Sequence, residues 1–153
     1  MEECCPKFNP KEWDYRQKVW KDKLFVKSHV TSFFHIPLNF GKMMKTSIKK
    51  IETSLAKDPE MIVLSDGVSL WGSDIYISVI DDVAEMKMTK LSGVFLTRVF
   101  EGPFKNMRKW IKEMKTYVKT QGQILDKLYF WHTNCPKCAK KHGVNYTVIF
   151  AKI

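Results

Sequence analysis

Apolar positions along the chain follow two spacings, one typical of strands and one typical of helices. Six segments are rich in β-branched and aromatic residues or alternate apolar with polar positions, as strands do. These segments are residues 23–35, 61–67, 74–80, 91–100, 128–133 and 145–153. A helical spacing follows the first of these segments, and another follows the fourth. The order therefore predicts an α+β protein in which the series strand–helix–strand–strand occurs twice.

Each predicted helix carries one apolar stripe, with apolar residues at steps of three and four. The stripe of the first helix consists of Phe40, Met43, Met44, Ile48, Ile51 and Leu55. The stripe of the second helix consists of Met107, Trp110, Ile111, Met114 and Val118. Asp58 and Pro59 should end the first helix, because the residue before a proline avoids helical geometry. Gln121 and Gly122 should end the second, since glycine is common just past a helix.

The two halves of the chain also match in sequence. Residues 30–43 align with residues 94–107 at a fixed offset, which places Met43 over Met107. The order of elements, the proline-containing break after the strand and the helix stripe all agree between the halves. We interpret this agreement as an internal duplication.

The duplication predicts how the domain is organised. A single domain of residues 1–153 would consist of an N-terminal arm at 1–22, a first half at 23–86 and a second half at 87–153. In each half a helix covers one face of an antiparallel sheet, and a second copy related by a pseudo-twofold can bury the other face. A central cleft is expected where the copies meet, because pockets favour interfaces between packed units.

The composition is that of a folded protein with more aromatic rings than one core needs. Apolar residues make up 44% of the 153 residues, and the chain has five Trp and ten Phe, so some rings are expected to line a cavity. No apolar run approaches the ~20 residues of a membrane span, and the N-terminus lacks the apolar region of a secretory signal. A cytoplasmic protein without a membrane segment is the default expectation.

The formal net charge of +10 comes from basic residues spread along the whole chain. Many of them lie on the polar faces of the predicted helices, as Lys42, Lys45, Lys49, Lys112 and Lys115 do. A solvated helix face is the simpler interpretation, and a nucleic-acid surface is the alternative. The sequence has no recognisable helix-turn-helix, zinc-finger or RNA-binding motif to favour that alternative.

One motif in the second half resembles a known family. The stretch FEGPFKNMRKWIKEMKTYVKTQG, residues 100–122, joins a strand to an amphipathic helix with a central Trp through a Glu-Gly-Pro-Phe turn. This pattern is similar to that of the gyrase-inhibitor-like (GyrI-like) small-molecule-binding family, which includes the effector-binding domains of multidrug-sensing transcription regulators. The likeness spans residues 24–153, although only the turn and the helix form a specific signature.

The resemblance implies two strand–helix–strand–strand units with a pocket at their junction. In the family, stacking rings and a buried acidic residue in this pocket take bulky, cationic or aromatic compounds, and Glu101 matches the acid. Some stand-alone members look like hydrolases of strained, toxic compounds. The chain departs from the regulators because no DNA-binding domain is recognisable in it, and its Cys-containing loop is absent from the family pattern.

Glu101 has two interpretations. It follows Phe100 and precedes Gly102, so its carboxylate could face the pocket, partly desolvated. There it would pair with a cationic ligand or act as a general base, and it would be the catalytic residue of an enzyme. Alternatively, it is a carboxylate in the first turn of a helix, where the helix dipole favours negative charge. We expect the pocket role.

Alternation along the predicted strands assigns side chains to the two faces of each sheet. In the third predicted strand the apolar positions suit a helix-facing core, so Asp74 and Tyr76 would face the cleft. In the fifth, Tyr129 and Trp131 share one face, and their amphipathic rings suit ligand contact better than the Leu and Phe of the opposite face. Ordinary core packing is the alternative for each ring.

Three further residues complete the ligand-binding candidates. Trp71 stands beside a glycine in a loop and could act as a lid. Tyr146 could, like Tyr76, supply a second polar group within reach of Glu101. His35 lies near a strand break and could contact a ligand, although a structural histidine is the simpler interpretation.

Four cysteines could form a metal site. Cys4, Cys5, Cys135 and Cys138 would supply four thiolates, two from each end of the chain, for one tetrahedral structural zinc ion. Adjacent cysteines chelate one metal awkwardly, so reduced thiols without a special role, or a redox pair, are the alternatives. No other motif requires a cofactor, because the sequence has no P-loop, no GxGxxG and no Ser-His-Asp order.

Three functions follow from these features. The first is a stand-alone binding protein for a hydrophobic or aromatic, in some cases cationic, small molecule. The second is a hydrolase on the same scaffold, in which Glu101 activates water. The third is a regulatory module that binds another protein. The choice among them, the ligand and the oligomeric state stay open from the sequence.

Overall fold

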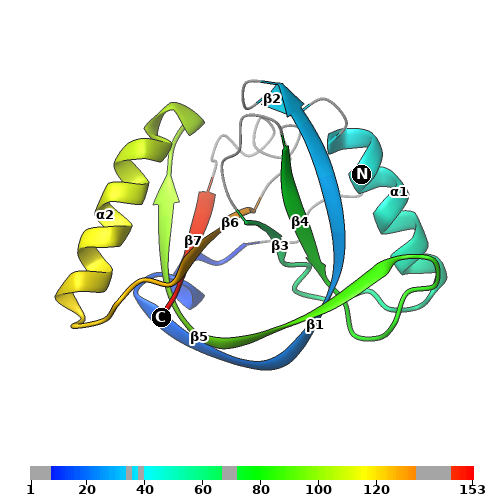
Figure 1. Ribbon diagram of the computed structural model, residues 1–153, viewed down its shortest axis with the longest axis horizontal. Helices are drawn as coiled ribbons and strands as arrows, with labels where there is room; N and C mark the ends of the chain where they lie inside the picture. Colours follow the sequence, from blue (N-terminus) through cyan, green and yellow to red (C-terminus); the bar gives the residue numbers. More distant parts are fainter. Residues whose placement is uncertain (1–7, 34–35, 38–39, 67–71, 134–145) are drawn as a thin grey trace. The chain divides into compact units, whose positions relative to one another are not determined.

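A computed structural model describes residues 8–33, 36–37, 40–66, 72–133 and 146–153 of the protein (Figure 1). Within these residues the helices α1 (Phe40–Thr53) and α2 (Met107–Thr120) alternate with strands, so the α+β prediction is confirmed. The strands are β1 (Arg16–Phe33), β2 (Ile36–Pro37), β3 (Val63–Ser65), β4 (Gly72–Ser78), β5 (Lys87–Glu101), β6 (Lys127–His132) and β7 (Tyr146–Lys152). Short 3-10 helices occupy Pro10–Glu12 and Phe104–Asn106.

The chain divides into two compact units. Unit 1 consists of residues 1–20 and 93–153, and unit 2 consists of residues 21–92. Strands β1 and β5 each begin in one unit and end in the other. In the part of the chain that the structure describes, no helix is long and apolar enough to cross a membrane.

Unit 2 has a helix beside a small antiparallel sheet, in which β4 lies between β1 and β3. Its core includes Val26 of β1, Ile51 of α1, and Ile75 and Ile77 of β4. Met43 of the predicted helix stripe packs against this cluster. The helix-facing side of β4 is therefore the side that its alternation predicts, because every second residue points to the same face.

Helix α1 ends earlier than predicted. Its last residue is Thr53, and the amide of Ala56 donates to the carbonyl of Ile51 at 3.1 Å while the amide of Leu55 donates to the carbonyl of Glu52 at 3.1 Å. These two bonds are those of a Schellman motif, which puts the residue after the helix in the left-handed conformation. Leu55 has a φ of 55° and is 84% exposed, so its assignment to the apolar stripe was wrong.

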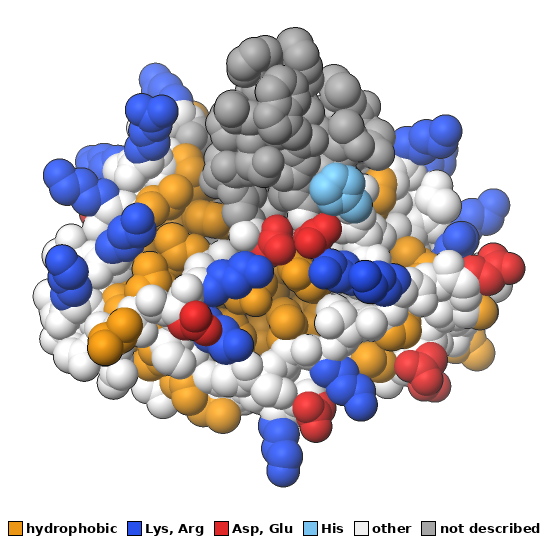
Figure 2. Space-filling view, viewed as in Figure 1, with side chains coloured by type: hydrophobic (Ala, Val, Ile, Leu, Met, Phe, Trp, Pro, Cys, Tyr) orange, Lys and Arg blue, Asp and Glu red, His pale blue; other side chains and the backbone are white. Residues whose placement is uncertain are grey.

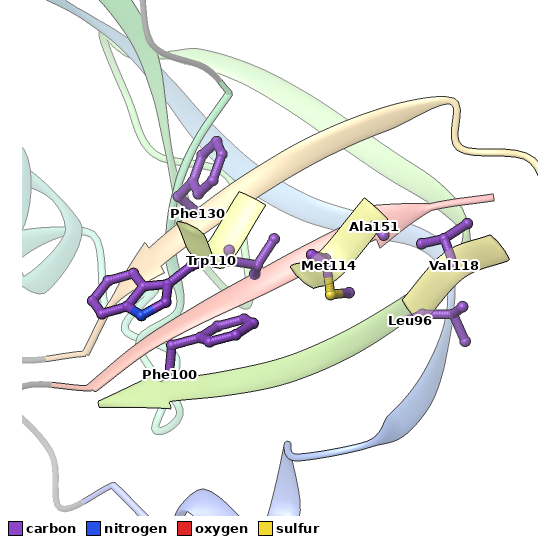
Figure 3. Close-up of a cluster of buried hydrophobic side chains, with 8 residues drawn as sticks. Leu96, Phe100, Trp110, Met114, Val118, Phe130 and Ala151 are labelled. Atoms are coloured by element: carbon purple, nitrogen blue, oxygen red, sulfur yellow. The ribbon is translucent and has the colours of Figure 1, made fainter. Parts of the chain in front are cut away.

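Unit 1 also has a helix on an antiparallel sheet, in which β7 lies between β5 and β6. Figure 3 shows how the side chains of Trp110, Met114 and Val118 of α2 point toward those of the strands. Their partners are Leu96, Phe100, Phe130, Ile149 and Ala151. The predicted stripe of the second helix is confirmed, and so is its end, since Gly122 has a φ of 69° and donates to Lys119 at 2.9 Å.

The described part of the predicted N-terminal arm is more structured than expected. Strand β1 begins at Arg16, not at residue 23, and a 3-10 helix capped by the Asn9 side chain precedes it. Tyr15, between these two elements, has a φ of 54°. Asp22, inside β1, has a φ of 51°, and a left-handed residue breaks the alternation of a strand, so the regular pattern that predicts the strand begins only after it.

The two units share one order of elements and one order of strands. In each sheet the last strand of the unit lies between the strand before the helix and the strand after it. Each helix can cover only one face of its sheet, so what lies on the other face decides where a ligand could bind. The predicted central cleft stays a prediction.

Basic side chains are spread over the surface shown in Figure 2 and do not gather in one patch. This distribution agrees with the interpretation of the charge as a solvated surface, because nucleic-acid-binding proteins cluster their Lys and Arg residues.

Candidate functional site

Four of the predicted site residues share the face of the unit 1 sheet that is turned away from α2. Phe100 and Phe130 belong to the core under α2, and alternation places their neighbours Glu101, Tyr129 and Trp131 on the opposite face. Tyr146 lies directly opposite Glu101 in the β5–β7 register and therefore on the same face. The side that the sequence assigned to Tyr129 and Trp131 is the side that they occupy.

Aromatic rings cover most of this face. The rings form a continuous set, which we call the aromatic cluster: Phe8, Trp13, Trp20, Phe95, Tyr129, Trp131, Tyr146 and Phe150. Phe95 lies 4.8 Å from Trp20 and 6.1 Å from Tyr129, measured between ring centroids. Tilted and edge-to-face contacts at these distances are favourable beyond the area they bury, because the edge of one ring meets the electron-rich face of the next.

The chain's own N-terminal segment, residues 8–15, fills the centre of this face. Trp13 is 7% exposed and its ring centroid lies 5.2 Å from that of Trp131 and 5.5 Å from that of Phe150. Phe8 lies 5.5 Å from Trp131 and 5.5 Å from Tyr146. Trp131 is consequently covered by side chains of this segment. The sequence signal that could have revealed this was the density of rings in the predicted arm.

Hydrogen bonds fix the N-terminal segment to β5. The Thr97 hydroxyl donates to the carbonyl of Trp13, and Thr97 is fully buried. The backbone amide of Val99 donates to the Asp14 carboxylate at 3.0 Å. The segment therefore lies along β5 without forming a strand there.

Glu101 lies at the edge of the aromatic cluster. It is the last residue of β5 and its side chain is exposed, so it is not the partly buried carboxylate that was predicted. The alternative interpretation was also wrong, because neither the 3-10 helix nor α2 has an acidic residue in its first turn. An exposed carboxylate opposite a half-buried Tyr146 can pair with a cation or accept a proton from water.

Backbone geometry explains why the Glu-Gly-Pro-Phe turn contains a glycine. Gly102 has a φ of 135°, which side chains rarely adopt, and a Cβ there would lie 3.4 Å from the Asn106 side-chain nitrogen and 3.6 Å from the Trp110 ring. The turn thus brings the end of β5 close to the start of α2. Glu101 is held at the rim of the sheet by this turn.

A second set of predicted residues lies in unit 2. Tyr76 of β4 is 6% exposed, and its hydroxyl donates to Asp66 Oδ2 at 3.2 Å. The backbone amide of Asp74 donates to Asp66 Oδ1 at 3.1 Å. Asp66 thus positions both predicted residues, and sequence reasoning missed it because it placed Asp66 at the end of a strand without a role.

The carboxylate of Asp74 pairs with two side chains of β1. Its carboxylate lies 3.5 Å from Lys27 Nζ and 3.2 Å from His29 Nδ1. Burial alone would raise the pKa of Asp74, but the His29 hydrogen bond and the Lys27 charge outweigh it and leave the pKa below its ordinary value. Asp74 is therefore ionised at neutral pH and suits a structural ion pair better than a general base.

The remaining candidates lie outside the described residues. They are His35, Trp71, Cys4, Cys5, Cys135 and Cys138. Among the residues that the structure does describe, no three His, Cys, Asp or Glu side chains gather as metal ligands would. The zinc site stays a prediction.

Comparisons with known proteins place the chain in a family and identify its fold. A family model described as "Bacterial hydrolase" matches residues 1–153. No curated protein matches the sequence. This family model is not that of the gyrase-inhibitor-like family, so the resemblance to that family stays a prediction.

Three solved structures illustrate this likeness. The EcmrR C-terminal domain has a TM-score of 0.68 at 9% identity, with 92% of this chain and 96% of that chain covered. A hydrolase from Listeria innocua has a TM-score of 0.65 at 10% identity, with 92% of each chain covered. SAV2435 bound to tetraphenylphosphonium has a TM-score of 0.53 at 12% identity, with 91% and 93% covered. At such identities the likeness shows the fold and not the activity.

Proposed function

The chain belongs to the family described as bacterial hydrolase, and from this premise we propose that it binds a hydrophobic, aromatic small molecule on the aromatic cluster of unit 1. The observation that carries the proposal is the shared face of Glu101, Tyr129, Trp131 and Tyr146. Rings supply the apolar contact area of a ligand site, and a few polar groups at its edge orient the ligand. The relative bound to tetraphenylphosphonium, a hydrophobic cation, has the same fold.

The exposed Glu101 suits a ligand that carries a positive charge. The formal net charge of the chain is +10, so the protein as a whole repels cations. A carboxylate at the rim of the aromatic cluster offsets this repulsion locally, and the rings attract a cation through their electron-rich faces. The ligand class that we propose is therefore an aryl compound with a diffuse positive charge.

The matching order of elements in the two units supports our proposal of an internal duplication. If both units descend from one ancestor, the residues on the free face of each sheet have diverged. Unit 1 has the larger aromatic cluster there, whereas unit 2 has the Phe25–Tyr76 ring contact among its described residues, together with the Asp66–Tyr76 and Asp74–Lys27 pairs. We propose that only the face of unit 1 has kept the composition of a ligand site.

Binding is tested with tetraphenylphosphonium as the probe. At a concentration of about 100 times Kd the probe should stabilise the fold by about 2.7 kcal/mol. For a chain of this size that is a rise in Tm of about 8 °C. Glu101→Gln should weaken binding of the cation about fivefold at low salt. The same substitution should leave binding of neutral triphenylphosphine oxide unchanged.

The matched control is Glu60→Gln. It removes the same charge from an exposed position in unit 2 and should leave the affinity of both probes unchanged. Failure of both probes to raise the Tm of the wild-type protein would contradict the proposal. An equal effect of the two substitutions would show that Glu101 contributes only to the overall charge.

Hydrolysis is the second candidate function, favoured by the family and by the exposure of Glu101 to water. In this reaction the Glu101 carboxylate accepts a proton from a water molecule while the water oxygen bonds to an electrophilic carbon of the ligand. The bond from that carbon to its leaving atom breaks, and the leaving atom takes up a proton. An aryl epoxide, which would yield a diol, is a suitable test substrate. Turnover by the wild type, with binding but no turnover by Glu101→Gln, is the expected result for an enzyme.

A further inference from the structure

Trp13 is a buried ring of the aromatic cluster that comes from the N-terminal segment. Its ring meets Trp131 at an interplanar angle of 82° and Phe150 at an angle of 46°. The ammonium group of Lys18 lies over the Trp13 ring, 4.5 Å from its centroid. Trp13 is therefore enclosed by two rings of the sheet and by one cation, which is an environment that would accept an aromatic ring from any source.

The backbone that carries Trp13 is held by a few local bonds. The amides of Trp13 and Asp14 both donate to the carbonyl of Pro10, at 3.2 and 2.9 Å. Strand β5 bonds to this segment through Thr97 and Val99, and through Arg98, which donates to the Tyr15 hydroxyl at 2.8 Å. A 3-10 helix that such side-chain bonds attach to a sheet opens more readily than a strand within a backbone ladder.

Tyr15 marks the point about which the segment could turn. It has a φ of 54°, a conformation disfavoured for residues with a side chain, and it directly precedes β1. Its side chain is 57% exposed, and rotation about this residue would break the contact of its ring with Tyr117 of α2, at 5.5 Å between centroids. Residues that absorb hinge motion are found at such ends of elements.

We propose that the N-terminal segment is a built-in occupant of the ligand site, and that an aryl group of the ligand takes the position of Trp13. This inference rests on the proposed function, since it concerns the same site. The ligand binds when the segment has swung away, and Trp131, Phe150 and Lys18 then contact the aryl group. The apparent Kd equals the intrinsic Kd divided by the fraction of molecules in which the segment is open.

The position that Trp13 occupies would accept only one part of the ligand. Lys18 stands over the ring position, so the group that enters there is a neutral aryl ring and not the charged centre. Glu101 lies at the rim of the same face, where the charged centre would be favoured. A molecule with an aryl group joined to a cationic centre fits both ends of the site.

The test compares variants that loosen the segment. Asp14→Ala removes the acceptor of the Val99 bond and leaves every ring in place. Loss of this hydrogen bond to a charged group makes opening of the segment easier. If the bond has ordinary strength, tetraphenylphosphonium should then bind about tenfold more tightly. Trp13→Ala removes the occupant itself and tightens binding further. Asp126→Ala, a control at a 66% exposed side chain of unit 1, leaves the Kd unchanged.

A second measurement does not depend on affinity. Saturation of the wild type with tetraphenylphosphonium should speed hydrogen exchange of the Trp13 and Asp14 amides, whereas a ligand that bound beside a closed segment would slow it. If the wild type binds the probe, and Asp14→Ala and Trp13→Ala bind it with the affinity of the wild type or more weakly, the N-terminal segment does not occupy the ligand site. The proposed function then stands. If neither the wild type nor the variants bind, the proposed function and this inference both fail.

Discussion

Trp13 of the N-terminal segment packs edge-on against Trp131 of β6, with the ring centroids 5.2 Å apart. This contact joins a segment that has no place in a sheet ladder to strand β6 of the unit 1 sheet. The edge-to-face geometry is favoured by the ring quadrupoles, and both rings are more than nine-tenths buried. The contact is therefore part of the stability of unit 1 as well as of the proposed site.

Removal of the Trp13 ring should be costly to the fold. Trp13→Ala should lower the free energy of unfolding by about 3 kcal/mol, because a buried ring is lost and a cavity remains. Val19→Ala, at a side chain that is 68% exposed, should change it by less than about 0.5 kcal/mol. Urea denaturation of both variants measures the difference. Equal stabilities of the two variants would show that the Trp13 side chain contributes nothing to unit 1.

Gly102 should tolerate a side chain less well than Gly122. Gly102→Ala should cost about 2 kcal/mol, since a φ of 135° is nearly restricted to glycine and the new Cβ would meet Asn106 and Trp110. Gly122→Ala should cost about 1 kcal/mol, because its φ of 69° is the left-handed region and the space around it is open. Chemical denaturation gives both values. The opposite ranking would mean that the turn relaxes to accept the side chain.

The regular elements of the fold were predictable because their periodicity survives in the sequence. The stripe from Met107 to Val118 identified α2 and its buried face, and alternation separated Phe130 from Tyr129 and Trp131. Both predictions depend only on the repeat of a helix or a strand. At Leu55 the apolar spacing of the helix continues in the sequence, but the helix itself has already ended.

The candidate site was predictable only in part for the same reason. Alternation assigned Tyr129 and Trp131 of β6 to one face, but it did not predict that Trp13 covers Trp131, because Trp13 lies in an irregular segment between a 3-10 helix and the left-handed Tyr15. The role of Asp66 likewise could not be predicted from the sequence. It depends on the register of β3 against β4, which brings its carboxylate to Tyr76 from a loop position.

The ion pairs of Asp74 should make unit 2 more stable at neutral pH than in acid. Since its pKa is below the ordinary value in the folded state, its contribution is complete above the pKa of the unfolded chain and is lost as the pH falls through the folded value. Asp74→Asn should therefore cost about 1 kcal/mol at pH 7, and the cost should vanish in strong acid. Urea denaturation between pH 7 and pH 2 follows the change.

Glu85→Gln is the control for this pH dependence. Glu85 is an exposed carboxylate of the same unit, and its removal should leave the pH dependence of stability as in the wild type. A cost of Asp74→Asn that did not change with pH would contradict the ion pairs with Lys27 and His29 as its cause.

The Arg98 side chain should contribute more to the attachment of the N-terminal segment than to the free energy of unfolding. Its guanidinium lies 4.5 Å from the Tyr15 ring, 4.9 Å from Phe100 and 5.7 Å from Tyr117, and its buried Nε has no hydrogen-bond partner among the described residues. Arg98→Met keeps the apolar stem between the rings and removes the unpaired N–H. It should change the free energy of unfolding by less than about 1 kcal/mol.

The same substitution removes the bond to the Tyr15 hydroxyl, so it should speed hydrogen exchange at the Asp14 amide. Arg98→Ala, which also loses the stem, should cost about 2 kcal/mol because the rings lose the apolar stem that packs among them. Denaturation and exchange measured on both variants separate the two roles. If Arg98→Met were as destabilising as Arg98→Ala while the Asp14 amide stayed protected, the guanidinium would stabilise the core and not the segment.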